Sequence, residues 1–177
     1  MTFARPTTRE AVEHAAARRL RRQAHTRWWI LGALALVAFA LDQITKAIIR
    51  SNLELRESHD VFPGFDISRV NNEGIAFGLF AGRQSAIAIL TVVALCAIAI
   101  ALAGLVARNA VVAAGAGLLV GGSLGNLVDR LWHGAVTDFL DFAHWPAFNV
   151  ADCGITVGAV LIVLGLLRED GERDDAG

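Results

Sequence analysis

Three aspartates lie close together in the C-terminal third of the sequence. Asp138 and Asp141 are followed by several aromatic residues, and Asp152 lies at the start of an apolar run. Two carboxylates held together in a poorly hydrated place cannot both ionise easily, so one pKa rises and the pair shares a proton. Such a pair can activate water as a base and protonate a leaving amine as an acid, as aspartic proteases do. The residues alone do not decide whether Asp138 or Asp141 pairs with Asp152.

These residues also have simpler structural explanations. Asn149 with an acid three residues later, Asp152, is the pattern of a capped helix start. Cys153 directly follows Asp152 and so points to another helix face, and we interpret it as a small buried thiol rather than a nucleophile. Four ligand-type residues could in principle bind a metal, but no metal is expected because their spacing fits no common ligand signature: His133, Asp138, Asp141 and His144.

The composition indicates a membrane protein. The 177 residues are 55% hydrophobic, and the mean hydropathy is +0.51. A spanning helix needs about 20 apolar residues, and four runs qualify: residues 28–49, 84–106, 110–128 and 148–167. The prediction is an all-α fold of four transmembrane helices forming one domain over residues 28–167. A short β segment on the membrane surface is expected within residues 53–70, and a turn over residues 69–82.

The arginines are unevenly distributed between the predicted loops and tails. Residues 1–27 form an arginine-rich tail and residues 168–177 an acidic one. With the 107–109 loop these tails hold ten arginines, against five in the two longer loops. The positive-inside rule therefore predicts that both termini are cytoplasmic and that the site lies near the extracytoplasmic face. Both tails are expected to be disordered, and we interpret the first as a topology anchor or lipid-facing segment rather than a nucleic-acid arm.

Polar residues of three runs fall at one depth. Asp42 and Lys46 lie one helical turn apart in the outer half of the first run. The third run ends, and the fourth begins, with further polar residues at the same level: Ser123, Asn126, Asp129, Arg130, Asn149 and Asp152. Ionisable residues inside a membrane segment are costly and usually functional. The convergence predicts a site at the outer boundary of the hydrocarbon.

The third run has two kinds of spacing. Gly117, Gly121 and Gly125 allow close helix packing. Gly122, Asn126 and Arg130 recur every four residues and form one stripe, in which the glycine leaves room for a ligand or for a helix. Asp129 and Arg130 are interpreted as a structural ion pair rather than a chemical one, with the alternative that Arg130 orients a carbonyl group or a catalytic carboxylate.

Four stretches together resemble the lipoprotein signal peptidase (signal peptidase II) family. They are "LDQITK" (41–46), "NNEGIAFGLF" (71–80), "GGSLGNLVDRLWHGAVTDF" (121–139) and "FNVADCGI" (148–155). The resemblance implies a four-helix bundle with a small extracytoplasmic β-cradle in the bacterial inner (plasma) membrane. It also implies an aspartyl endopeptidase that cuts lipidated prolipoproteins before the diacylglyceryl-modified cysteine and is inhibited by globomycin. The expected partners are this substrate and membrane lipid, with no nucleic acid, and the expected state is a monomer.

The resemblance also assigns roles to residues. It selects Asp138 and Asp152 as the catalytic pair. It implies substrate contacts by Asn72, Gly122, Asn126, Arg130 and Asn149, and supporting roles for Asp42, Lys46 and Asp129. Gly78 departs from the serine usual at its position.

Two other functions remain alternatives at this stage. A small transporter or proton relay would use Asp42, Lys46 and Asp152 as a pathway, but charges at one depth do not form a chain across the membrane. A non-catalytic chaperone for lipidated helices is opposed only by the acid pair.

Overall fold

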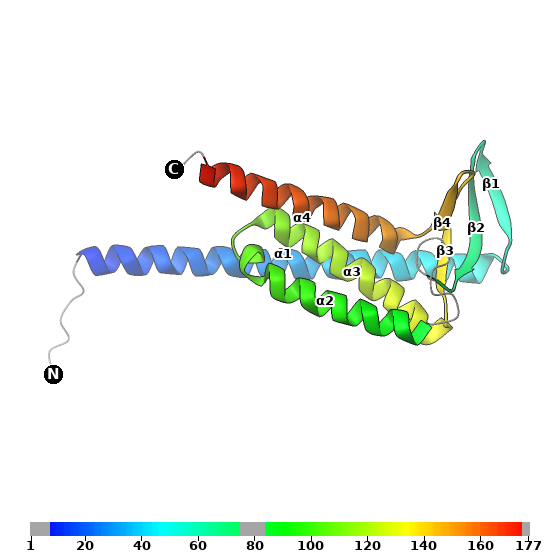
Figure 1. The fold of residues 1–177 in the computed structure, drawn as a ribbon, viewed down its shortest axis with the longest axis horizontal. Helices are drawn as coiled ribbons and strands as arrows, with labels where there is room; N and C mark the ends of the chain where they lie inside the picture. Colours follow the sequence, from blue (N-terminus) through cyan, green and yellow to red (C-terminus); the bar gives the residue numbers. More distant parts are fainter. Residues whose placement is uncertain (1–7, 75–83, 175–177) are drawn as a thin grey trace.

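The structure is a computed structural model and describes residues 8–74 and 84–174. Its elements follow in the order α1 (Thr8–Asn52), β1 (Ser58–Phe62), β2 (Phe65–Asn72), α2 (Gln84–Val106), α3 (Ala110–His133), β3 (Val136–Phe142), β4 (Trp145–Phe148) and α4 (Val150–Asp174). The four helices form a bundle, and the sheet lies across the end opposite both termini (Figure 1). All four helices are long and apolar enough to span a membrane, which agrees with the predicted fold class.

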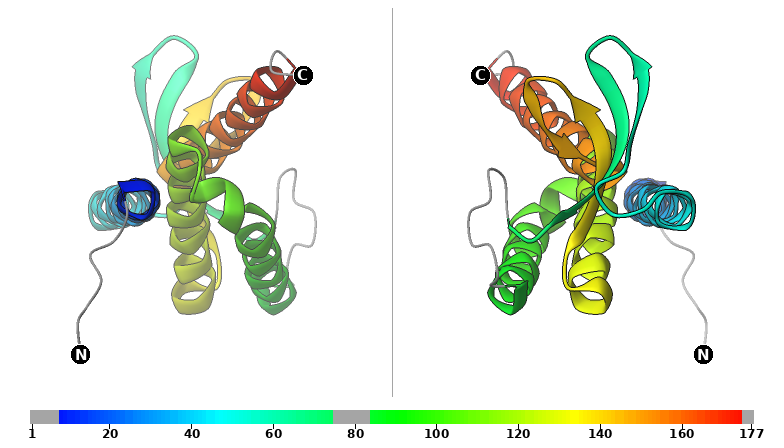
Figure 2. Two further views of the ribbon diagram at one scale, coloured as in Figure 1. Left: turned by 90° about the vertical axis from the view of Figure 1, so that its left-hand side faces the viewer. Right: turned by 90° about the vertical axis from the view of Figure 1, so that its right-hand side faces the viewer.

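The helix α3 is the centre of the bundle. It packs against each of the other three helices, which Figure 2 shows arranged around it. Two adjacent glycines allow this: a Cβ on Gly121 would collide with the backbone of Ala35 in α1, and one on Gly122 with the backbone of Ala151 in α4. Small residues at these positions let the helix backbones approach closely. The tight-packing interpretation of the glycine spacing is therefore confirmed at Gly121.

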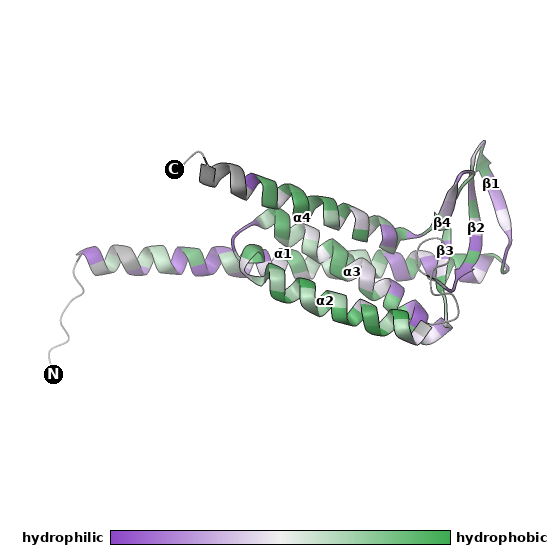
Figure 3. Ribbon diagram, viewed as in Figure 1, coloured by the Kyte–Doolittle hydropathy of each residue, from purple (hydrophilic) through white to green (hydrophobic). Residues whose placement is uncertain are grey.

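Apolar side chains face outward along most of the bundle. Figure 3 shows hydrophobic residues along α2, α4 and the middle of α1, with hydrophilic residues at the start of α1 and around the sheet. Exposed apolar side chains on a helix bundle are expected where lipid replaces water as the solvent. Three phenylalanines contact one another at the sheet, where Phe65 lies 5.0 Å from Phe62 and 4.6 Å from Phe142, measured between ring centroids.

The sheet joins the two long loops. Its four antiparallel strands lie in chain order, with Gly64 at φ 88° in the turn between β1 and β2. The pairing of β2 with β3 sets Val70 opposite Asp138 and Asp66 opposite Asp141. The β segment expected within residues 53–70 is confirmed, but β3 and β4 were not predicted from the residues.

Three of the four helices, α1, α3 and α4, have other bounds than the predicted spans. The expectation of disordered tails is wrong for the described parts, because α1 starts at Thr8 and α4 continues to Asp174. The helix α3 extends to His133 instead of residue 128, where Gly134 in the left-handed region ends it. The predicted bounds of α2 are confirmed.

Candidate functional site

The two acids selected by the resemblance are delivered by different elements. Asp138 lies in the middle of β3 and is only 2% exposed, and Asp152 lies in the first turn of α4. Asp138 accepts hydrogen bonds from the side-chain amide of Asn149 at 2.6 Å and from that of Asn72 at 2.9 Å. Both carboxylate oxygens of Asp138 are thus held by neutral donors.

Asp152 serves as a helix cap and as part of the site. Its Oδ2 accepts from the backbone N–H of Asn149 at 3.2 Å, while the side chain of Asn149 accepts from the N–H of Asp152 at 3.0 Å. This is a reciprocal capping box, in which two orphan donors of the helix start are satisfied. Its second oxygen, Oδ1, accepts from the side-chain amide of Asn126 at 2.8 Å. The capping interpretation is confirmed, and it fixes the carboxylate in place.

Asn126 and Asn149 connect the two acids. The side-chain amide of Asn149 donates to the side-chain oxygen Oδ1 of Asn126 at 3.2 Å as well as to Asp138. A continuous chain therefore runs from Asp138 through the two asparagines to Asp152. Both asparagines are buried, which keeps water from competing for these bonds.

A second polar cluster lies against the first. Lys46 is fully buried and contacts Asp42 at 2.9 Å, Asp129 at 3.3 Å and the side-chain oxygen of Asn126 at 2.8 Å. Asp42 and Asp129 are fully buried too. The contact with Asn126 directs the amide group of that residue toward Asp152. Lys46 thus orients a donor of the acid pair without touching either acid.

Asp129 has other partners than the sequence suggested. The predicted ion pair with Arg130 is wrong: Asp129 pairs with Lys46 and with Arg50, which lies at 3.2 Å, and accepts from the N–H of Thr137. Arg130 instead donates to the backbone of Gly74 at 3.1 Å. Arg50 was missed in the sequence, although it lies one helical turn beyond Lys46 and so on the same face of the first helix.

A cavity of about 530 Å³ opens beside the acid pair. Its polar end is formed by Asn72, Asn126, Arg130, Asp138 and Asp152, and apolar side chains of three helices continue it, including Ile87, Leu90, Leu95, Ile98, Leu119 and Ile155. The Nε of Arg130 is buried and has no hydrogen-bond partner in the described part of the chain. An unsatisfied buried donor is costly, so this guanidinium is suited to a carbonyl group entering the cavity.

Two residues assigned to substrate contact lie elsewhere. Gly122 packs against the backbone of α4 and does not line the cavity. Asn149 is fully buried, is hydrogen-bonded to both acids and is not a lining residue either. Gly122 thus contributes by helix packing and Asn149 by holding Asp138. Gly78 lies outside the described residues, as does most of its motif.

The other candidates stay apart from the acid pair. Asp141 is only half-buried and is paired across the strands with Asp66, outside the cavity. Cys153 is exposed, so the prediction of a buried thiol is wrong. Within residues 8–74 and 84–174, no group of three or more ligand-type side chains is suited to a metal ion. The polar groups of the transporter alternative gather at one end of the bundle and do not form a path through it.

Burial changes the proton affinity of Asp138. Loss of solvent, with a smaller contribution from the charge of Asp152, raises the pKa of Asp138 to about 7. Hydrogen bonds from Asn72 and Asn149 oppose this shift but do not cancel it. A carboxyl group with such a pKa can hold and release a proton near neutral pH.

Comparisons with known proteins give a family match over most of the chain. The family described as "Signal peptidase (SPase) II" matches residues 34–168. The chain is similar to the "Lipoprotein signal peptidase" of Geobacter sulfurreducens, with 40% identity covering 80% of this chain and 93% of that protein. It is also similar to the one of Maridesulfovibrio salexigens, with 35% identity covering 80% and 97%.

Solved structures give the same result. A structure titled "Bacterial membrane enzyme structure by the in meso method at 2.3 A resolution" superposes with a TM-score of 0.69 at 32% identity, covering 79% of this chain and 88% of the other. A second bacterial membrane enzyme superposes with a TM-score of 0.64 at 33% identity, covering 76% and 90%. The fold is therefore that of known membrane enzymes.

Proposed function

The chain belongs to the signal peptidase II family and is a membrane peptidase of lipoprotein maturation, and we propose that Asp138 and Asp152 are its catalytic pair. One observation carries the proposal: two carboxylates from different elements border one cavity, and each is held by neutral amides. The assignment of Asp138 rather than Asp141 is supported by burial and by the lining of the cavity.

The protonation states of the two acids differ in the proposed reaction. Asp138 carries the proton, as its raised pKa favours, and Asp152 starts as the carboxylate. Asp152 takes a proton from water while the water oxygen bonds to the peptide carbon. Asp138 gives its proton to the carbonyl oxygen, which forms a neutral tetrahedral intermediate. Asp152 then gives its proton to the peptide nitrogen while Asp138 takes one back from a hydroxyl of the intermediate, and the C–N bond breaks to leave a carboxyl group and an amine.

Neighbouring residues position the peptide. Arg130 and Asn126 border the polar end of the cavity and can donate to substrate carbonyls. Asn72 and Asn149 hold Asp138, and Lys46 orients Asn126. Asp42, which accepts from the N–H of Ala151 at the start of α4, and Asp129 keep the supporting charge network together.

The substrate we propose is a lipidated prolipoprotein, cut before its diacylglyceryl-modified cysteine. The apolar part of the cavity along α2 is suited to a signal helix or acyl chains, while the polar end receives the peptide bond. Proposed with it are inhibition by globomycin and action as a monomer without metal, cofactor or nucleic acid. The arginine distribution supports cytoplasmic termini, which leaves the site at the extracytoplasmic end.

A paired substrate test addresses this proposal. The purified chain is incubated with a diacylglyceryl-modified precursor and with the same precursor lacking the lipid. We expect cleavage before the modified cysteine in the first precursor only, and inhibition by globomycin. Equal cleavage of both precursors, or cleavage at another bond, would contradict the proposed specificity.

A further inference from the structure

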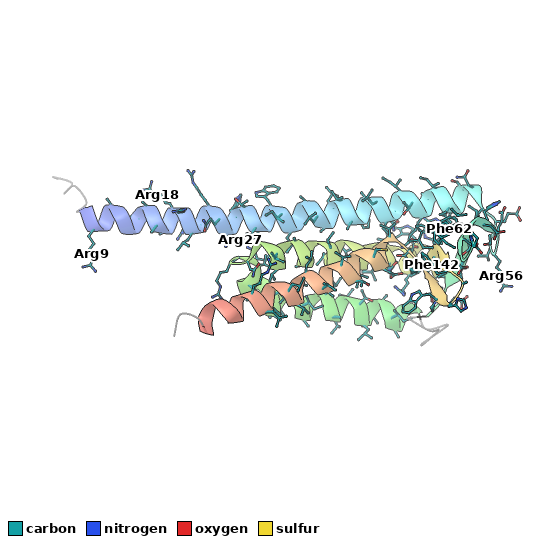
Figure 4. The ribbon with its side chains drawn as sticks, turned by 90° about the horizontal axis from the view of Figure 1, so that it is seen from above. Arg9, Arg18, Arg27, Arg56, Phe62 and Phe142 are labelled. Carbon is teal, nitrogen blue, oxygen red and sulfur yellow. The ribbon has the colours of Figure 1, made fainter. Side chains whose placement is uncertain are left out.

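The first part of α1 is an addition to the peptidase. The family match begins at residue 34, whereas α1 begins at Thr8 and runs without a break through both regions. Residues 8–27 project past the turn between α2 and α3, as Figure 4 shows with Arg9, Arg18 and Arg27 labelled. We call this segment the basic extension. Nothing in the acid-pair chemistry uses it.

The basic extension carries a concentrated positive charge. Four of its arginines, Arg18, Arg19, Arg21 and Arg22, are exposed, and none of them forms a hydrogen bond or ion pair with the described residues. Arg27 is half-buried and donates to the backbone oxygen of Ala107 at 2.7 Å, which joins the extension to the α2–α3 turn. Arg27 thus anchors a helix on which the guanidinium groups of Arg18, Arg19, Arg21 and Arg22 are exposed.

A cavity of about 900 Å³ lies along this helix down to the start of α3. Three of the exposed arginines border it, together with Arg27 and further hydrogen-bonding side chains: Arg18, Arg19, Arg22, His14, Gln23 and Thr26. Guanidinium groups bind phosphate through two parallel hydrogen bonds. The lining therefore matches a phosphate-bearing ligand in its positive charge and in its hydrogen-bond donors.

The position along the helix indicates the source of the phosphate. Trp28 and Trp29 follow directly and are 45% and 67% exposed, and tryptophan marks the interface between membrane and water. Arg22 lies roughly 9 Å before Trp28 at 1.5 Å per residue, within side-chain reach of lipid headgroups. We propose that the basic extension binds the phosphate groups of anionic phospholipids in the adjacent leaflet, which holds this end of α1 at the membrane surface.

The test measures lipid affinity with the full-length chain in a neutral detergent. The probes are dioctanoyl phosphatidylglycerol and dioctanoyl phosphatidylcholine, titrated by calorimetry at fixed ionic strength. We expect at least about tenfold tighter binding of the anionic lipid, falling as salt increases. The triple variant Arg18→Gln, Arg19→Gln, Arg22→Gln should lose most of this preference, and the triple lysine variant should retain part of it.

Control variants and competitors complete the design. Arg56→Gln, at the sheet end, should keep the preference, and cleavage of a lipidated precursor should be unchanged in every variant. Free phosphate at the same concentration should displace the lipid poorly. Equal affinity for both lipids, an unchanged triple glutamine variant, or tighter binding of a short RNA than of phosphatidylglycerol would overturn the proposal.

Discussion

Two clusters of buried acids lie side by side at the sheet end of the bundle and differ in what neutralises them. Asp42 and Asp129 are paired with Lys46, and Asp129 also with Arg50. Asp138 and Asp152 form no ion pair among the described residues and are held by amide donors instead. A neighbouring cation stabilises the ionised form of a carboxyl group more strongly than a neutral amide does, so the acids held by amides are better able to exchange a proton near neutral pH. We therefore assign a structural role to the first cluster and the catalytic role to the second.

The largest effect is expected from the second cluster. Asp138→Asn and Asp152→Asn each remove the acid proton and the negative charge while keeping the size. Loss of a general acid–base group typically lowers the rate by about 10²–10⁴-fold. Members of a pair act as a unit, so the double variant should be no worse than either single one. A gel-shift assay of precursor cleavage at matched amounts of folded protein measures this rate. A cleavage rate close to that of the parent in either single variant would contradict the assignment of the chemistry to the second cluster.

A substitution in the first cluster should lower the stability of the protein more than it lowers the cleavage rate. Lys46→Met leaves buried negative charge without its cation, and breaking a buried pair in this way costs about 3–5 kcal/mol. Thermal unfolding in detergent should show a large fall in Tm. Ile44→Ala, an exposed position on the same helix, is the control and should change Tm little. An unchanged Tm with a large loss of turnover in Lys46→Met would contradict this and would assign Lys46 a role in the cleavage reaction.

The pH dependence of stability should separate the clusters further. The pKa of Asp138 is raised on folding, so the folded state holds a proton that the unfolded state has released between about pH 4 and pH 7. Stability therefore falls as pH rises through this window, by up to about 1.4 kcal/mol per pH unit, and is constant above it. Asp138→Asn should remove this dependence and be more stable than the parent at pH 8. Unfolding curves from pH 4 to pH 8 measure it, and a parallel slope in the variant would contradict the assignment.

The smallest effects are expected outside both clusters. Asp141→Asn should keep most of the cleavage rate, because Asp141 faces Asp66 and not the cavity. Cys153→Ser and added EDTA should also leave cleavage nearly unchanged. An inactive Asp141→Asn beside an active Asp138→Asn would mean that the wrong acid was chosen. Abolition by EDTA with rescue by zinc would restore the metal interpretation at His133 and His144.

The sequence pattern predicted features that depend on neighbouring residues and missed contacts between segments that are far apart in the chain. Apolar length gave the bounds of α2, and helical spacing gave the Asp42–Lys46 pair, because both depend on neighbours in sequence. The strand that carries Asp138 was missed, since it pairs with residues 65–72, far away in the chain. The partner of Asp129 was missed for the same reason: Lys46 and Arg50 lie on another helix. The choice of Asp138 over Asp141 came from the family resemblance and not from the residues themselves.

The central claim is that Asp138, which has no cationic partner among the described residues, holds the exchangeable proton. Infrared titration of the carboxyl groups tests this claim most directly. The protonated C=O band is followed from pH 4 to pH 9 in the parent chain, Asp138→Asn and Asp129→Asn. We predict a band that disappears with a midpoint near pH 7, is absent in Asp138→Asn and persists in Asp129→Asn. A parent chain without such a band, or a band lost in Asp129→Asn and kept in Asp138→Asn, would contradict the division between the two clusters.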